Sequence, residues 1–273
     1  TSVVLFNQDE PSTTLLSGFT IQNGVDTNYP SGSGLSIKYA DPTLKNLIVR
    51  GNSGGAGAIS VHGPSQSIIQ NVLVHENDTQ GIFSWFSTPI IMNSTIVNNV
   101  YNGVYTYPGG SPTLVNSIIT NNGENNVFLS EQSDSPGQVS IAYSMVGGGQ
   151  EGVVLNNGTL DWGPGNINTD PQFLDVENDD YHLSDISPCI SSATASITIG
   201  GTDYHSPASD LDGSSRPNPS GTNPDMGAYE SDRGVDPDYN GPLWYVDGSA
   251  NLPYGNGGPG APFNSIVEAM ESA

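Results

Sequence analysis

The chain has 273 residues, of which 28 are acidic and 5 are basic, and its formal net charge is −23. Such a charge repels nucleic acid and anionic membrane surfaces, so we expect neither as a partner. No run of 18 apolar residues is present to cross a bilayer, and the single Cys189 excludes a disulfide within the chain. High acidity with few lysines is typical of proteins exposed to salt or divalent cations, so we expect an extracellular protein.

Residues 1–160 contain a short repeat. A first series of asparagines recurs at offsets of 25, 22 and 23 residues, at Asn46, Asn71, Asn93 and Asn116. A second asparagine follows each of them six positions later, at Asn52, Asn77, Asn99 and Asn122. A period this short, with brief strands and no helical pattern, predicts the coils of a parallel β-solenoid. We therefore expect an all-β fold with about six coils over residues 1–160.

The two-residue period of a strand predicts which side chains of each coil face the core. The positions two before, one after and three after each first-series asparagine should point inward. They are Leu44, Leu47, Val49, Ile69, Val72, Val74, Ile91, Ser94, Ile96, Leu114, Ser117 and Ile119, and in a shifted register Ile141, Ser144 and Val146. The intervening positions, which include Arg50, His75 and Thr95, should point outward. The asparagines should lie at the bends, where amide side chains can form ladders between coils about 4.8 Å apart.

A third series of strands begins at Gly34, Gly57, Gly81, Gly103 and Asn126. Counting two and four residues from each start predicts the outward positions Ser36, Lys38, Ile59, Val61, Phe83, Trp85, Tyr105, Tyr107, Phe128 and Ser130. Five of them form an aromatic stripe over three successive coils: Phe83, Trp85, Tyr105, Tyr107 and Phe128. Single exposed apolar side chains are common on protein surfaces, but a contiguous row of this kind indicates a contact surface. Sugar rings could stack on this stripe. Alternatively, another segment, such as residues 131–165, or a neighbouring subunit covers it.

The outward strand positions give little support to an enzyme. Hydrolysis of polysaccharides needs carboxylates that converge on one face, and the outward strand positions assigned here contain none. A lyase acting on acidic glycans needs a cation to neutralise the uronate and a base to remove the α-proton. Arg50 and His75, expected in adjacent coils on one face, are the candidate lyase residues.

Residues 161–231 lack the repeat and carry a different set of motifs. These are Asp170-Pro-Gln-Phe-Leu-Asp175, Ser187-Pro-Cys-Ile190, Asp210-Leu-Asp-Gly213, Arg216-Pro217 and Asp225-Met-Gly-Ala-Tyr-Glu230. In this order they resemble the C-terminal module of secreted bacterial right-handed β-helix proteins of the choice-of-anchor type, which follows a pectate-lyase-like solenoid. The resemblance implies a right-handed parallel β-helix, a secreted or cell-surface location, and a β-rich capping module that carries no known active site; we expect this module to cover the last coil. Asp210 and Asp212 resemble part of a calcium loop, so calcium is the one candidate cofactor.

Residues 232–242 read as a linker, and residues 243–273 resemble the first strand, loop and capping helix of another β-helix. The strand contains Trp244, Tyr245 and Val246, and the helix has Asn264 or Ser265 as its N-cap and an apolar stripe formed by Phe263, Ile266, Val267 and Met270. The chain thus starts in mid-coil and ends in a cap without coils. Either it is a piece of a larger tandem array, or residues 243–273 of one subunit dock on the first coil of the next and build a filament.

Together these patterns predict an extracellular structural or adhesive β-helix protein. Its expected partners are copies of itself, joined head to tail, and a polysaccharide on the aromatic stripe. The alternative is a polysaccharide lyase, and the fold alone does not decide between the two because the same solenoid serves both kinds of protein.

Overall fold

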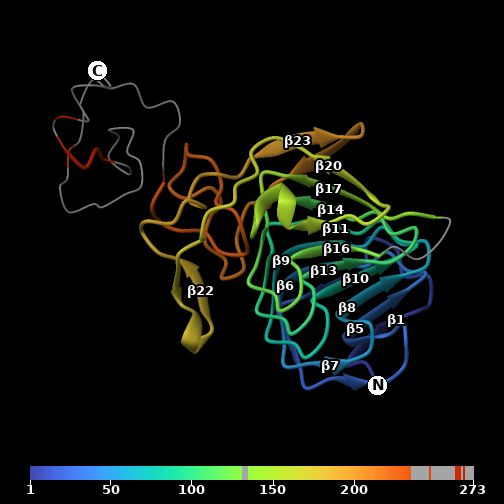
Figure 1. Cartoon of the computed structure of the whole chain (residues 1–273). Helices are drawn as coiled ribbons and strands as arrows, with labels where there is room; N and C mark the ends of the chain where they lie inside the picture. The colour runs from blue at the N-terminus through green and yellow to red at the C-terminus, as the bar shows by residue number, and fades with distance from the viewer. Residues whose placement is uncertain (131–134, 235–245, 247–261, 266, 268–273) are drawn as a thin grey trace.

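The computed structural model describes residues 1–130, 135–234, 246, 262–265 and 267. Two parallel sheets form the walls of a solenoid in which each coil stacks on the one before it (Figure 1). Sheet A is seven-stranded, in the order β1 (Val4–Phe6), β5 (Gly32–Lys38), β8 (Gly57–His62), β10 (Ile82–Trp85), β13 (Val104–Thr106), β16 (Val127–Leu129) and β19 (Val153–Val154). Sheet B is 11-stranded and contains β2 (Leu15–Ser17), β3 (Thr20–Gln22), β6 (Thr43–Arg50), β9 (Ile68–His75), β11 (Ile90–Met92), β12 (Thr95–Val97), β14 (Thr113–Val115), β15 (Ile118–Thr120), β17 (Gln138–Ala142), β18 (Met145–Val146) and β20 (Thr159–Trp162). The all-β solenoid of about six coils is confirmed.

The core of the solenoid lies between the two sheets and is one side chain deep from each wall. All side chains predicted to point inward from the first asparagine series are 0% exposed, including the three serines. The serines are satisfied by the backbone: the Ser94 hydroxyl donates to the Met92 carbonyl at 2.9 Å and accepts the Val72 N–H at 3.2 Å. Strand alternation therefore predicts this face correctly.

The two series of asparagines have different structural roles. The second series forms a continuous ladder, in which the amide nitrogens of Asn52, Asn77 and Asn99 donate to the side-chain oxygens of Asn77, Asn99 and Asn122 at 2.9, 2.8 and 3.0 Å. The first series instead has left-handed backbone, with φ of 52, 53, 45 and 55° at Asn46, Asn71, Asn93 and Asn116. Asparagine tolerates this conformation better than most residues, which explains its recurrence at the bend.

The predicted faces are wrong for one coil of sheet A. Ile59 and Val61 were expected outward, but both are 0% exposed and belong to the core. In β8 the equivalent of Gly34 and Gly81 is Ala58 and not Gly57, since Leu35 pairs with Ile59 and Ile59 with Ile82. A one-residue shift of register exchanges the two faces of a strand. Ser60 and His62 therefore occupy the outward positions.

Residues 163–231, which follow β20 and are here called the C-terminal module, lie beside the solenoid (Figure 1). Two antiparallel pairs, β21 (Phe173–Asp175) with β22 (Asp180–Leu183) and β23 (Ser196–Ile199) with β24 (Thr202–His205), account for its strands. The remaining short elements of the described chain are the strand pair β4 (Val25–Asp26) and β7 (Ser53–Gly54), and the 3₁₀ turns η1 (Gly149–Gly152) and η2 (Val176–Asn178).

The module packs mainly along the side of the solenoid, which differs from its expected place over the last coil. One apolar cluster joins Ile118 and Met145 of the solenoid to the module residues Leu183, Cys189, Ile190, Ala193 and Met226. A second cluster joins Leu73 and Val97 to Tyr181, Ala228 and Tyr229. The first-series asparagines contribute polar contacts, since Asn71 Nδ2 donates to Ser209 O and Asn116 Nδ2 to Thr194 O at 2.6 and 2.8 Å. The outward face of sheet B is thus an internal interface over several coils.

Candidate binding surfaces

The aromatic stripe forms one contiguous cluster on the outer face of sheet A. Phe83 pairs in register with Tyr105, which pairs with Phe128, and their ring centroids are 5.5 and 5.4 Å apart. The rings of Trp85 and Tyr107 lie 5.8 Å apart, edge to face. We call Tyr29 together with these five residues the aromatic surface.

Tyr29 is the part of this surface that the repeat did not reveal. It reaches over from the first coil, and its ring lies 5.7, 6.2 and 6.1 Å from those of Phe83, Trp85 and Tyr107. Phe83 is consequently 0% exposed, whereas the other stripe residues are only half-buried. Tyr29 is 56% exposed, and Phe86, whose ring lies 5.8 Å from that of Trp85, is 50% exposed. Among the described residues, Tyr29 therefore covers part of the stripe. Residues 131–134 of the segment expected to cover it lie outside the described residues.

The candidate lyase residues Arg50 and His75 do lie side by side in adjacent strands, as predicted. The C-terminal module contacts both of them, however, and it buries His75. Arg50 Nη1 donates to Asp179 Oδ2 at 2.9 Å, and the His75 ring, 1% exposed, packs edge to face against Tyr181 with centroids 5.1 Å apart. His75 is therefore inaccessible to a polymer, whereas the Arg50 side chain is 41% exposed and is held by Asp179.

His75 instead belongs to a group with Glu76 and Asp179. Its Nδ1 lies 3.9 Å from Glu76 Oε2 and 3.8 Å from Asp179 Oδ1, and the three ligand atoms lie within 4.8 Å of one another. Burial lowers the pKa of His75 to about 4, against the opposing effect of the Asp179 carboxylate. Burial, and then Asp179, raises the pKa of Glu76. Sequence reasoning paired His75 with Arg50 but could not find Asp179, which lies in another part of the chain.

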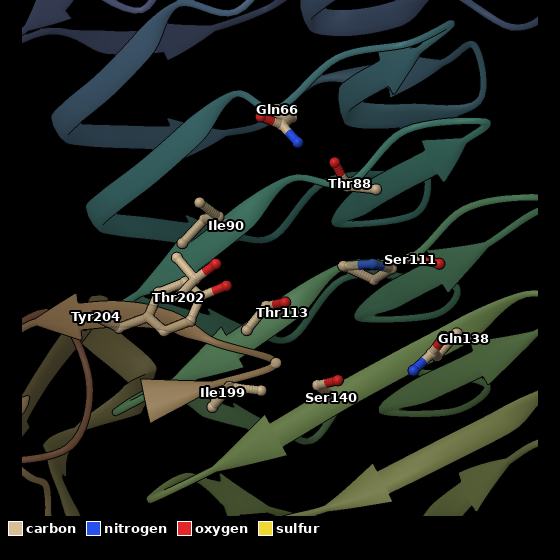
Figure 2. A pocket seen from close by; sticks show the side chains of 12 residues that line it. Gln66, Thr88, Ile90, Ser111, Thr113, Gln138, Ser140, Ile199, Thr202 and Tyr204 are labelled. Carbon is tan, nitrogen blue, oxygen red and sulfur yellow. The ribbon is translucent and has the colours of Figure 1, made fainter. Parts of the chain in front are cut away.

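A groove of about 320 Å³ lies between the outer face of sheet B and the β23–β24 hairpin (Figure 2). Its floor is built from equivalent positions of successive coils, and its wall from the hairpin. The lining residues are Gln66, Thr88, Ile90, Ser111, Pro112, Thr113, Gln138, Ser140, Ile199, Gly200, Thr202 and Tyr204. Hydroxyl and amide groups dominate this lining, and it contains no carboxylate.

The two aspartates of the suggested calcium loop are engaged by hydrogen-bond donors. The two oxygens of Asp210 accept the backbone N–H groups of Ser214 and Glu230 at 2.7 and 2.8 Å. Asp212 Oδ2 lies 2.8 Å from His182 Nε2, and Asp180 holds the other ring nitrogen of His182 at 2.6 Å. Calcium at this loop stays a prediction that these contacts do not favour.

Arg216 and Glu230 belong to two of the sequence motifs of the C-terminal module, and they meet in its interior. Their side chains form an ion pair at 2.9 Å with 0% exposure on both sides. Arg216 also donates to the carbonyls of Asp225, Gly227 and Ala228. Burial raises the pKa of Glu230 to about 7, opposed by the nearby guanidinium. These motif residues form the polar core of the module.

The expected docking segment is described only in part. Val246 pairs with Phe263 in an isolated parallel bridge, Phe263 is buried, and Val267 is helical and 61% exposed. The other residues predicted to dock, Trp244, Tyr245, Ile266 and Met270, lie outside the described residues, as does most of the linker at 232–242.

These observations define a solenoid of the parallel β-helix class. Residues 2–142 match the family of the right-handed β-helix region, and the chain belongs to this family. No curated protein and no solved structure matches the chain significantly. Among the described residues, no helix is long and apolar enough to cross a membrane.

Proposed function

We propose that the protein is an extracellular β-helix with a structural or adhesive role that contacts a neutral polysaccharide through the aromatic surface. The observation that carries this proposal is the set of half-buried rings on successive coils, with the exposed Tyr29 and Phe86 at their margin. Aromatic faces present a large apolar area with little conformational freedom to lose, which suits the apolar faces of sugar rings. A coil-to-coil repeat of such rings matches a ligand that is itself a polymer.

The charges favour binding over catalysis and a neutral over an acidic glycan. No strand of sheet A contains Asp or Glu, so the aromatic surface has no pair of carboxylates from its own strands for hydrolysis. A net charge of −23 would repel a polyuronate, which is the substrate that the lyase alternative requires. The burial of His75 and the ion pair of Arg50 with Asp179 also argue against that alternative.

Binding to neutral polysaccharides, measured by affinity electrophoresis with the full chain, tests the proposal. Trp85→Ala combined with Tyr107→Ala should weaken retardation by the polymer at least about tenfold, since these two rings stand together at the open part of the surface. The matched control is Thr113→Ala with Gln138→Ala in the groove of Figure 2, which should bind as the wild type does. Equal binding by the aromatic double variant would refute the aromatic surface as the site, and loss in the groove variant alone would move the site to the groove.

A second candidate role, head-to-tail assembly, is favoured by the apolar surface of the first coil. Val3, Leu5, Leu15, Phe19 and Val25 are each between 48 and 60% exposed. Among the described residues β1 is the edge strand of sheet A, and an edge strand can pair with a strand of another copy. We propose that residues 243–273 of a second copy dock there. Light scattering should then show oligomers that disappear when residues 243–273 are deleted, and a full-length chain that stays monomeric at high concentration would rule the docking out.

A further inference from the structure

His75, Glu76 and Asp179 bring one imidazole and two carboxylates together at the seam between the solenoid and the C-terminal module. His75 is the last residue of β9, and Glu76 follows it in the turn. Asp179 lies between η2 and β22 of the module. The three side chains therefore come from both sides of the interface.

The Nδ1 atom of His75 points to a ligand that these carboxylates would share with it. This nitrogen is buried and has no hydrogen-bond partner, although buried polar atoms are nearly always paired. Its distances to Glu76 Oε2 and Asp179 Oδ1, 3.9 and 3.8 Å, are too long for hydrogen bonds. Both distances fit two ligand atoms bound to the same metal ion. With metal–ligand bonds of about 2.0 to 2.2 Å, two ligand atoms can lie up to about 4.4 Å apart.

The surrounding groups also suit a cation. Two neighbouring carboxylates repel each other, and a divalent ion would neutralise both. Arg50 donates a hydrogen bond to Asp179 Oδ2 and leaves Asp179 Oδ1 directed at His75. Hydrogen bonds of this kind commonly orient the carboxylate ligands of metal ions. The Glu76 side chain is 53% exposed, so it is free to rotate onto an ion and the site keeps access to water.

The ligand set selects the kind of ion. One imidazole nitrogen with two carboxylate oxygens and an open position suits Zn²⁺ and related transition-metal ions. Calcium takes six to eight oxygen ligands and does not favour imidazole. We propose that His75, Glu76 and Asp179 bind one divalent transition-metal ion of the zinc class, which fastens the C-terminal module to the side of the solenoid. This inference does not depend on the proposed function.

Isothermal titration of the chelator-treated full chain with zinc chloride tests the site, with thermal denaturation as a second readout. The wild type should bind one ion per chain at a saturable site and melt at a higher temperature with zinc. Glu76→Gln and Asp179→Asn should each weaken binding at least about tenfold and lose the shift in melting temperature. Glu76 is an exposed residue, so its variant should fold normally.

The matched control is His182→Gln, which removes a histidine whose two ring nitrogens already lie at hydrogen-bonding distance from Asp180 and Asp212. It should bind zinc as the wild type does. Three outcomes would overturn the proposal: only weak, unsaturable binding to the acidic surface; a saturable site that Glu76→Gln and Asp179→Asn leave unchanged; or calcium bound at this site more tightly than zinc.

Discussion

The asparagine ladder should hold the coils together, and Asn77→Ala tests it. Asn77 is 0% exposed. Its Nδ2 donates to Val49 O, His75 O and Asn99 Oδ1 at 2.9, 2.9 and 2.8 Å. Its Oδ1 accepts from the backbone nitrogen and the side-chain nitrogen of Asn52 at 3.0 and 2.9 Å. The side chain thus joins three successive coils.

The magnitude follows from these contacts. Truncation leaves the Asn52 backbone N–H buried without this acceptor, which costs about 1 to 3 kcal/mol. The two amide hydrogens of Asn77 contribute about 0.5 to 1.5 kcal/mol each. We therefore expect Asn77→Ala to lower the free energy of unfolding by about 4 kcal/mol. Asn77→Asp should cost more at neutral pH, because a carboxylate there would face the oxygens of Val49, His75 and Asn99 without a donor.

Urea denaturation followed by far-ultraviolet circular dichroism measures the effect, and Asn125→Ala is the control. Asn125 is half-buried, and its side chain makes one ladder-like bond, from Nδ2 to Asn102 Oδ1 at 2.8 Å. Its loss should cost about 1 kcal/mol or less. If both alanine variants shifted the urea midpoint equally, the ladder would not be a source of coil-to-coil stability.

Two further predictions concern buried charge. Burial, with the charge of Lys38, lowers the pKa of His62 to about 4. As the pH falls below about 6.5, this histidine is therefore protonated in the unfolded chain before it is protonated in the folded chain. The free energy of unfolding should decrease by about 3 kcal/mol between about pH 6.5 and pH 4 and then stay constant. His62→Gln should remove about this share of the fall in urea midpoint and leave the share of His75, whose pKa is lowered to about 4 as well; an unchanged curve would contradict the assignment. Arg216→Leu leaves the carboxylate of Glu230 buried without its partner and should destabilise the C-terminal module by about 3 to 5 kcal/mol, seen as rapid proteolysis within residues 163–231 while the solenoid resists. The control Arg233→Leu removes an exposed pair with Asp185 and should leave the proteolytic pattern unchanged.

The sequence by itself determined the coil, the inward face of sheet B and the order of the aromatic stripe. These features repeat at a fixed local period, and each coil buries the same positions against its neighbours. The left-handed bends at Asn46 and its equivalents are local as well, since they depend on the backbone preference of one residue type. Local reasoning failed within the solenoid at β8, because the count started from Gly57 although Ala58 holds the equivalent position. The alternation of Ile59 and Val61 with Ser60 and His62 would have given the correct inward face.

Only the tertiary structure decided what covers the outward faces. Thr95, expected to point outward, does so but is 1% exposed, and its hydroxyl accepts the N–H of Ala228 at 3.0 Å. Thr95→Asp should therefore disturb the interface with the C-terminal module. Tyr29 meets the aromatic stripe, and Asp179 meets His75, across long stretches of chain. The physical reason is that strand alternation specifies which way a side chain points relative to its own coil, whereas the surface it then meets depends on how remote segments pack. The candidate metal site and the burial of His75 both depend on that packing.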